Sequence, residues 1–171
     1  MQIQCDTREK KSEIQRIEQQ FDALGIQHFR SKLYVGDYMN LDNPRLVIDR
    51  KKDLQELCGN VTQQHERFKK ELLRAEEQGI RMIILCEHGE DIHELEDVYF
   101  WDNPRRKLYK WVTINGKPRR VKENPRKLAI SGQQLFKCLS TIKRRYGVLF
   151  YFCDKSETGK RIAELLRIEN G

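Results

Sequence analysis

The stretch GDYMNLDNPRLVIDRKKDL, residues 36–54, decides the expected fold, because a run of β-favouring residues in it ends abruptly in charge. Leu46, Val47 and Ile48 lead directly into DRKK, residues 49–52. A strand that starts in an apolar interior therefore ends among closely packed charges. Burying charge against a sheet is costly unless the groups pair with each other or bind a metal. The residues at the end of this strand are thus candidates for a functional site.

Aliphatic runs and amphipathic stretches around this segment indicate alternating strands and helices. We expect strands over 1–5, 28–35, 45–48, 81–87 and 148–153, and helices over 12–24, 62–78, 131–146 and 154–167. The Asn43-Pro44 turn signal predicts that 28–35 and 45–48 form an antiparallel pair. The pattern predicts a single α/β domain over residues 1–171, with a central mixed sheet flanked by helices and an insertion at 96–128.

Length and cysteine usage limit the class of protein. A chain of 171 residues is long enough to bury a real core in one domain and short for two. Neither a signal-peptide pattern nor an apolar run of roughly eighteen residues is present, so we expect a cytoplasmic protein of a bacterial or virus-infected cell, without a membrane partner. The five cysteines contain no C-x-x-C pair, which argues against a disulfide framework and a structural zinc site. Cys5, Cys86 and Cys153 are expected to be buried small hydrophobes.

Positive charge is concentrated in one segment. Residues 104–127 contain ten Lys and Arg and one acid, Glu123, whereas the whole chain has a net charge of +7. A solvated, mobile loop is one interpretation. Tyr109, Trp111 and the turn signal Asn115-Gly116 favour an ordered hairpin that binds nucleic acid instead. The residues expected to contact DNA are Arg105, Arg106, Lys107, Lys110, Trp111, Lys117, Arg119 and Arg120.

The acids near the end of the 45–48 strand suggest phosphodiester hydrolysis, which needs a divalent cation held by oxygen ligands. Asp37 and Asp49 are expected to meet across the strand pair and to hold Mg²⁺ or Mn²⁺. Lys51 lies two residues beyond Asp49, so both side chains point to the same face of the strand. From there the lysine can orient or deprotonate the attacking water, or stabilise the phosphate in the transition state. Arg50 points the other way and is expected to pair with an acid such as Asp6 or Glu9.

Several motifs in one order resemble the nuclease domain of the XPF family, which includes the archaeal Hef nuclease. They are Asp6-Thr7-Arg8-Glu9, the GDY of 36–38, the hydrophobic-hydrophobic-acid-Arg-Lys of 47–51, Gln64-His65-Glu66-Arg67, and an apolar strand ending in Glu87. The resemblance covers about residues 2–88. It implies a metal-dependent DNA endonuclease with the restriction-endonuclease-like fold and the PD-(D/E)xK arrangement of acids and lysine.

Carried over by position, the resemblance assigns metal binding to Asp37 and Asp49 and a catalytic role to Lys51. The residues that line or brace the site would be Arg50, Asp6, Arg8, Glu9, Glu87, Gln64 and Arg67. The family's ERK is DRK here, one methylene shorter, and we transfer no role to Asp53. The resemblance also implies action on DNA in repair or recombination, by a homodimer and without a small-molecule cofactor. Family members usually add helix-hairpin-helix modules, for which we expect no room in this chain, so selectivity for flap, fork or branched DNA is an expectation that does not follow from the resemblance alone.

Other interpretations of these residues remain open. Asp6 and Arg8 can form a structural ion pair, and Asp37 can cap a turn. Trp111 can stack on bases or pack within the hairpin. Two alternative functions follow: a non-catalytic nucleic-acid-binding protein that retains the nuclease fold, and a protein-interaction module with a basic face.

Overall fold

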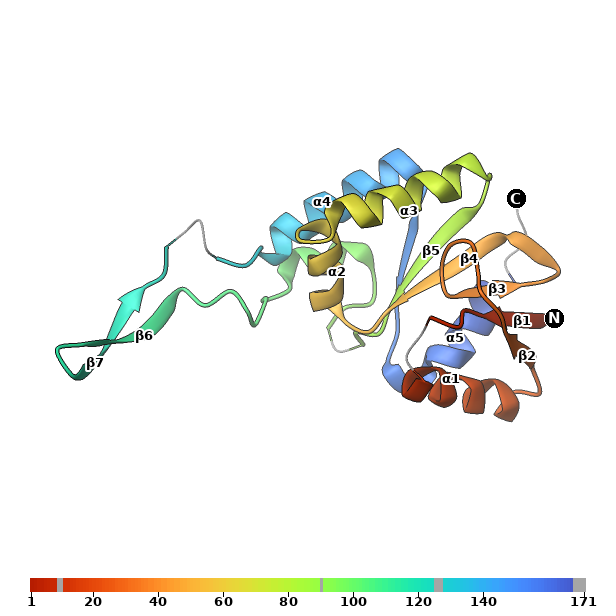
Figure 1. Ribbon diagram of the computed structural model, residues 1–171, viewed down its shortest axis with the longest axis horizontal. Coiled ribbons are helices and arrows are strands. Elements are labelled where there is room, and N and C mark those ends of the chain that lie inside the picture. The colour runs from red at the N-terminus through yellow and green to blue at the C-terminus, as the bar shows by residue number, and fades with distance from the viewer. Residues whose placement is uncertain (9–10, 90, 125–127, 168–171) are drawn as a thin grey trace.

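A computed structural model describes residues 1–8, 11–89, 91–124 and 128–167 and contains a six-stranded sheet (Figure 1). Its strands are β1 (Gln2–Cys5), β2 (Gln27–Arg30), β3 (Tyr38–Asn40), β4 (Asn43–Lys51), β5 (Arg81–Cys86) and β8 (Leu149–Phe152). Their order is β2-β1-β3-β4-β5-β8. The sheet is mixed, because β3 runs antiparallel to both β1 and β4 while the other neighbours are parallel.

Helices cover both faces of this sheet (Figure 1). One layer contains α2 (Leu54–Val61), α3 (His65–Glu77), α4 (Gly132–Tyr146) and the 3₁₀ helix η1 (Leu95–Phe100). The other contains α1 (Lys11–Ala23) and α5 (Thr158–Leu165), which follows the short 3₁₀ helix η3 (Lys155–Glu157). The expected fold class, a mixed sheet flanked by helices, is confirmed.

The alternation of side chains along β4 decides which charges go to which layer. Val47 packs into the core beneath α2, α3 and α4, whereas Leu46 and Ile48 pack into the core beneath α1 and α5. Continuing this period of two, Asp49 and Lys51 lie on the α3 side and Arg50 lies on the α1 side. The end of β4 therefore supplies charge to both faces of the sheet.

The predicted pairing of 28–35 with 45–48 is wrong. β2 is shorter than expected and pairs in parallel with β1, and the strand that pairs with β4 is β3. Gly36 lies between β2 and β3. Glycine is needed there because φ is +70°, a conformation that L side chains rarely adopt, and because a Cβ would lie 3.1 Å from the Ile48 carbonyl oxygen. Asp37 consequently precedes a strand instead of ending one.

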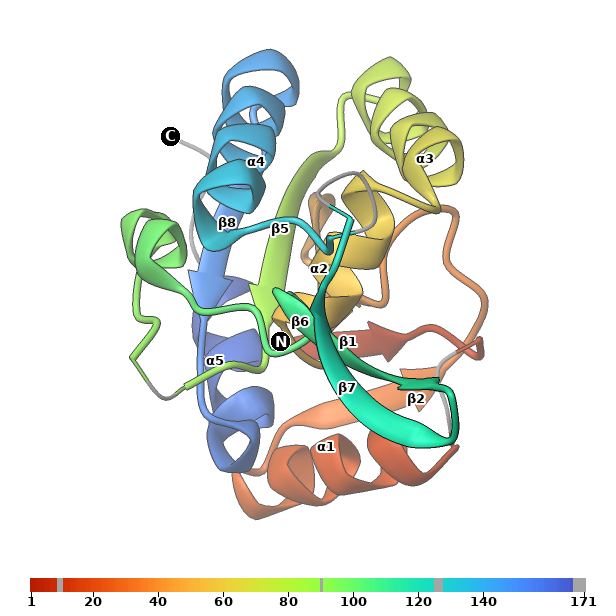
Figure 2. The same cartoon turned by 90° about the vertical axis from the view of Figure 1, so that its left-hand side faces the viewer.

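The predicted basic hairpin is confirmed. β6 (Tyr109–Ile114) and β7 (Lys117–Lys122) pair in antiparallel register around Asn115 and Gly116. Both turn residues have positive φ, as a type I′ turn requires. The hairpin projects from the body on the side where β4 ends and α2 begins (Figures 1 and 2). The projecting segment is shorter in sequence than the expected insertion of 96–128, because Val98 of η1 is fully buried in the core.

Other expectations concern the interior and the membrane. Cys5, Cys86 and Cys153 are buried as expected, and burial raises the pKa of the Cys5 thiol to about 12. None of the helices in the described ranges has the length and hydrophobicity needed to cross a bilayer.

Candidate active site

Asp37, directly before β3, lies against the end of β4, from which Asp49 projects. The backbone N–H of Asp37 donates to the Ile48 carbonyl over 2.8 Å. Its carboxylate accepts the backbone N–H of Arg50, also at 2.8 Å. Hydrogen bonds to the β4 backbone on either side of Asp49 therefore hold Asp37 in position.

Lys51 is buried beside these two acids. Its Nζ lies 2.8 Å from Asp49 Oδ1 and 2.7 Å from Oδ2, which confirms that the two side chains share a face. The ammonium also lies 5.7 Å from the centre of the Phe68 ring on α3. Burial by itself lowers the pKa of Lys51, but attraction to Asp49 and Asp37 outweighs burial and raises that pKa above its ordinary value. Lys51 is thus a cation in this arrangement.

Arg50 lies on the opposite face of the sheet, in a network that the sequence predicts only in part. Its guanidinium pairs with Glu87 at 3.0 Å and lies 3.7 Å from Glu13 of α1. The expected pairing with Asp6 is wrong, because Asp6 is bound by Arg8. Glu9, the other expected partner and an expected site residue, lies outside the described residues.

Glu87 is the centre of that network. Its side chain is fully buried and accepts from Arg50, from Arg16 of α1 and from the hydroxyl of Thr158 at the start of α5. These partners join the end of β5 to both helices of the α1 side. Glu87 therefore stabilises the end of the sheet on its α1 side, opposite to Asp49 and Lys51.

Asp6 and Arg8 form a closed unit at the end of β1. The Arg8 Nε–H donates to both Asp6 oxygens at 3.0 and 2.9 Å, and the backbone N–H of Arg8 donates to one of them at 2.8 Å. Burial alone would raise the pKa of Asp6, but the Arg8 guanidinium and the backbone N–H groups of Arg8 and Leu33 lower it. The unit adjoins the aspartates, because the Asp6 N–H donates to the Asp37 carbonyl at 2.8 Å. The Arg8 side chain remains about half exposed.

Gln64 and Arg67 lie at the start of α3 and face two different hollows. Gln64 accepts a hydrogen bond from Asn60 at 3.4 Å and lines a pocket of about 450 Å³ with Arg50, Glu56 and Arg105. Arg67 lines a separate pocket with Arg8. Asp53, to which we transferred no role, caps α2 by accepting the N–H of Glu56 at 2.8 Å.

The residues expected to contact nucleic acid divide into two groups. Arg105 and Arg106 precede the hairpin: Arg105 lines the pocket beside Arg50, and Arg106 donates to the carbonyl of Ala129, which follows the hairpin. On the hairpin, Lys110 pairs with Glu123 at 3.0 Å, while Trp111 is 72 % exposed and Arg120 stacks over the Tyr109 ring at 4.5 Å. Lys107, Lys117 and Arg119 are exposed as expected.

The donor set at Asp37 and Asp49 fits a hard divalent cation. Asp49 Oδ2 is buried and, although it lies near Lys51, accepts no hydrogen bond of good geometry from any described residue. Within the described ranges no three His, Cys, Asp or Glu side chains gather as a metal-binding group. Two carboxylates are nevertheless sufficient for Mg²⁺, which usually keeps several waters and takes its remaining oxygens from a bound phosphate.

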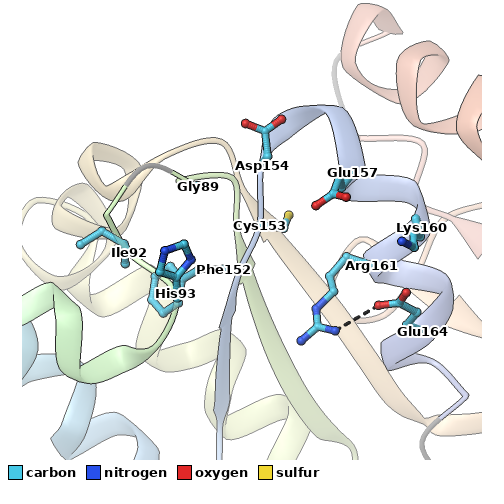
Figure 3. A pocket seen from close by; sticks show the side chains of 10 residues that line it. All are labelled: Gly89, Ile92, His93, Phe152, Cys153, Asp154, Glu157, Lys160, Arg161 and Glu164. Carbon is cyan, nitrogen blue, oxygen red and sulfur yellow. Dashed lines mark hydrogen bonds and ion pairs between the residues drawn. The ribbon is translucent and has the colours of Figure 1, made fainter.

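A further hollow, of about 300 Å³, lies at the end of β8, with Gly89, Ile92 and His93 on one side and α5 on the other (Figure 3). Three of its charged groups have protein partners: Arg161 pairs with Glu164 at 3.0 Å, and Asp154 accepts the N–H of Ser156 at 2.7 Å. Burial raises the pKa of the Cys153 thiol that faces it to about 11, so this thiol is a poor nucleophile at neutral pH. We assign no chemistry to this hollow.

Sequence reasoning missed several residues around the site. Glu13, Arg16 and Thr158 complete the Glu87 network, and Glu71 of α3 accepts the N–H of Gly36 at 3.3 Å. The helical spacing of Glu13 and Arg16 was the available signal for their ion pair. No local pattern marks Thr158 or Glu71, because their partners are distant in the chain.

A mixed sheet with helices on both faces, and an acid-x-Lys pair beside a second aspartate at one strand end, defines an α/β domain of the nuclease type. The chain belongs to the ERCC4 domain family, whose model matches residues 5–165. The resemblance to the XPF nuclease domain is thereby confirmed. A comparison with curated proteins found no match.

Solved structures with the same fold include XPF from Aeropyrum pernix, with a TM-score of 0.61 and 19 % identity over 98 % of this chain and 60 % of that one. A second is XPF from Aeropyrum pernix in complex with DNA, with a TM-score of 0.60 and 17 % identity over 97 % of this chain and 63 % of that one. This chain thus spans less than two thirds of those XPF chains. At these identities the likeness shows the fold alone.

Proposed function

We propose that this nuclease-type domain is a Mg²⁺- or Mn²⁺-dependent DNA endonuclease that hydrolyses phosphodiester bonds and is selective for flap, fork or branched DNA. The observation that carries the proposal is the buried Asp49–Lys51 pair with Asp37 fixed beside it. A protein that only binds DNA gains nothing from buried acids at its binding site, because acids repel phosphates unless a cation lies between them. Membership of the ERCC4 domain family supports the same conclusion.

In this mechanism Asp37 and Asp49 would hold the cation at the end of β4. A bound Mg²⁺ or Mn²⁺ would neutralise phosphate charge and make water a stronger nucleophile at neutral pH. The Lys51 ammonium donates to a non-bridging phosphate oxygen, where negative charge grows as water attacks. Arg8, held in place by Asp6, presents a second cation to the substrate.

The hairpin supports the proposed substrate. Its exposed Trp111 and the stacked Tyr109–Arg120 pair provide aromatic and planar cationic surfaces of the kind on which unpaired bases stack. XPF from Aeropyrum pernix has been solved in complex with DNA, which supports DNA as the substrate. The expected dimer and cytoplasmic location remain predictions from the sequence.

The direct test incubates purified protein with duplex, flap, forked and single-stranded DNA, with Mg²⁺ or with EDTA. We expect cleavage only with Mg²⁺ and fastest on substrates that join paired and unpaired strands, whereas binding persists in EDTA. Binding to all substrates without cleavage under any condition would select the non-catalytic nucleic-acid-binding protein instead. Cleavage that continues in EDTA would contradict the proposed metal dependence.

A further inference from the structure

One face of α3 carries three exposed cations. Arg67, Lys70 and Arg74 are spaced by three and four residues, which places them on one side of the helix. All three are exposed, and none forms an ion pair with another described residue. Like charges at this spacing repel each other and destabilise a helix. An anionic partner would remove that repulsion.

These cations line a pocket of about 420 Å³ together with Arg8 and Glu71. The one acid in this set, Glu71, binds the protein backbone, because its Oε1 accepts the Gly36 N–H at 3.3 Å. Arg8 is bound to Asp6. The charge left to attract a ligand is therefore positive and comes mainly from α3. We call this hollow the α3 pocket.

The α3 pocket adjoins the proposed cleavage site. Gly36, whose N–H is bound by Glu71, directly precedes Asp37. Asp6, which holds Arg8, donates its backbone N–H to the Asp37 carbonyl at 2.8 Å. A strand of DNA with one phosphate at Asp37 and Asp49 thus has a cationic surface beside it, along the side of α3 that faces away from the core.

We infer that the α3 pocket binds a phosphate of the DNA backbone next to the phosphate that is cleaved, with Lys70 and Arg74 as its principal contacts. The inference rests on the proposed function only for the identity of the polyanion. Lys70 and Arg74 contact phosphate and not bases, so the interaction is independent of sequence and sensitive to salt. By holding the neighbouring phosphate, the pocket determines which phosphodiester bond lies beside Lys51.

The test measures binding in EDTA, so it does not depend on cleavage. Fluorescence anisotropy with a labelled fork and a labelled duplex, over a series of salt concentrations, gives both the affinity and its salt dependence. For Lys70→Ala/Arg74→Ala we expect affinity at least about tenfold lower, and the slope of log K against log salt smaller by about 1 for each residue removed. The reduction is expected to be equal for DNA of different sequence.

The matched control is Lys143→Ala/Arg144→Ala, which removes the same charge from exposed positions at the end of α4. This variant is expected to bind DNA within about twofold of wild type, at the level of a surface change without a phosphate contact. Arg74→Gln alone, which keeps a long polar side chain, serves if the double variant unfolds, and is expected to lower the slope by about 1.

Each outcome decides the inference. Unchanged affinity and slope in the α3 variant, or equal losses in the α3 and α4 variants, would overturn the inference while leaving the proposed function standing if wild type still cuts DNA. Failure of wild type to bind any DNA would overturn both. A loss confined to the α3 variant, with wild-type thermal stability, is the result that the geometry predicts.

Discussion

Asp49→Asn is expected to lower the rate of single-turnover DNA cleavage at saturating Mg²⁺ by at least about 10³-fold, because it removes a proposed metal ligand and the anion beside Lys51. Asparagine has nearly the same size, so the end of β4 keeps its shape. DNA binding in EDTA is expected to stay equal or to tighten, since one negative charge near the phosphate is lost. Quenched-flow or gel-based cleavage, together with anisotropy, measures the two effects separately.

The control for this change is Asp42→Asn, which removes the same charge at a side chain that is 71 % exposed in the turn between β3 and β4. Its cleavage rate is expected within about twofold of wild type, as for most surface substitutions. Thermal unfolding of Asp49→Asn shows whether the variant is folded when assayed. A folded Asp49→Asn protein that cuts DNA within about tenfold of wild type would remove Asp49 from the mechanism.

The second large effect concerns stability and the opposite face of the sheet. Glu87→Ala is expected to lower the free energy of unfolding by about 3 to 5 kcal/mol, because Arg50, whose side chain is 6 % exposed, loses its principal buried partner. Thr158 also loses the acceptor of its hydroxyl hydrogen bond. Urea unfolding followed by circular dichroism, with linear extrapolation to water, measures this quantity.

The comparison for this prediction is Glu164→Ala, which breaks a pair with Arg161 in which both side chains are more than a third exposed. Exposed pairs contribute at most about 1 kcal/mol, so the free energy of unfolding is expected to change by less than that. Equal, small losses for Glu87→Ala and Glu164→Ala would show that the Glu87 network does not brace the end of the sheet.

The parts of the fold that the sequence predicts are those with a local physical cause. Ser131 caps α4 with a reciprocal bond to Gln134, and Gly147 ends it at a φ of +65°. The apolar run of β5 packs into both cores, Met82 toward one layer and Ile83 toward the other. The shared face of Asp49 and Lys51 follows from the period of a strand alone.

The errors concern partners that local patterns do not encode. Residues 28–35 alternate only loosely, and no local feature distinguishes pairing with β4 from the observed parallel pairing of β2 with β1. The sequence predicts Asp6 as one partner of Arg50, because Asp6 is an acid at the end of another strand. The structure shows that Arg8, two residues from Asp6, forms the closer pair and that Arg50 faces α1.

The candidate site divides in the same way. Asp37, Asp49, Lys51 and Arg8 belong to recognisable motifs. Glu71 and Thr158 reach their partners only through the packing of α3 and α5. The partners of a helix face depend on which strand it covers. They therefore follow from the sheet order and not from the helix sequence.

The most direct measurement for the whole account is anomalous X-ray diffraction from crystals of the protein grown with Mn²⁺ and an uncleavable DNA. We predict a Mn²⁺ peak within bonding distance of carboxylate oxygens of both Asp37 and Asp49, with Lys51 Nζ hydrogen-bonded to the adjoining phosphate. A peak elsewhere, or DNA seated over the two aspartates without any bound ion, would contradict metal-dependent hydrolysis at this site.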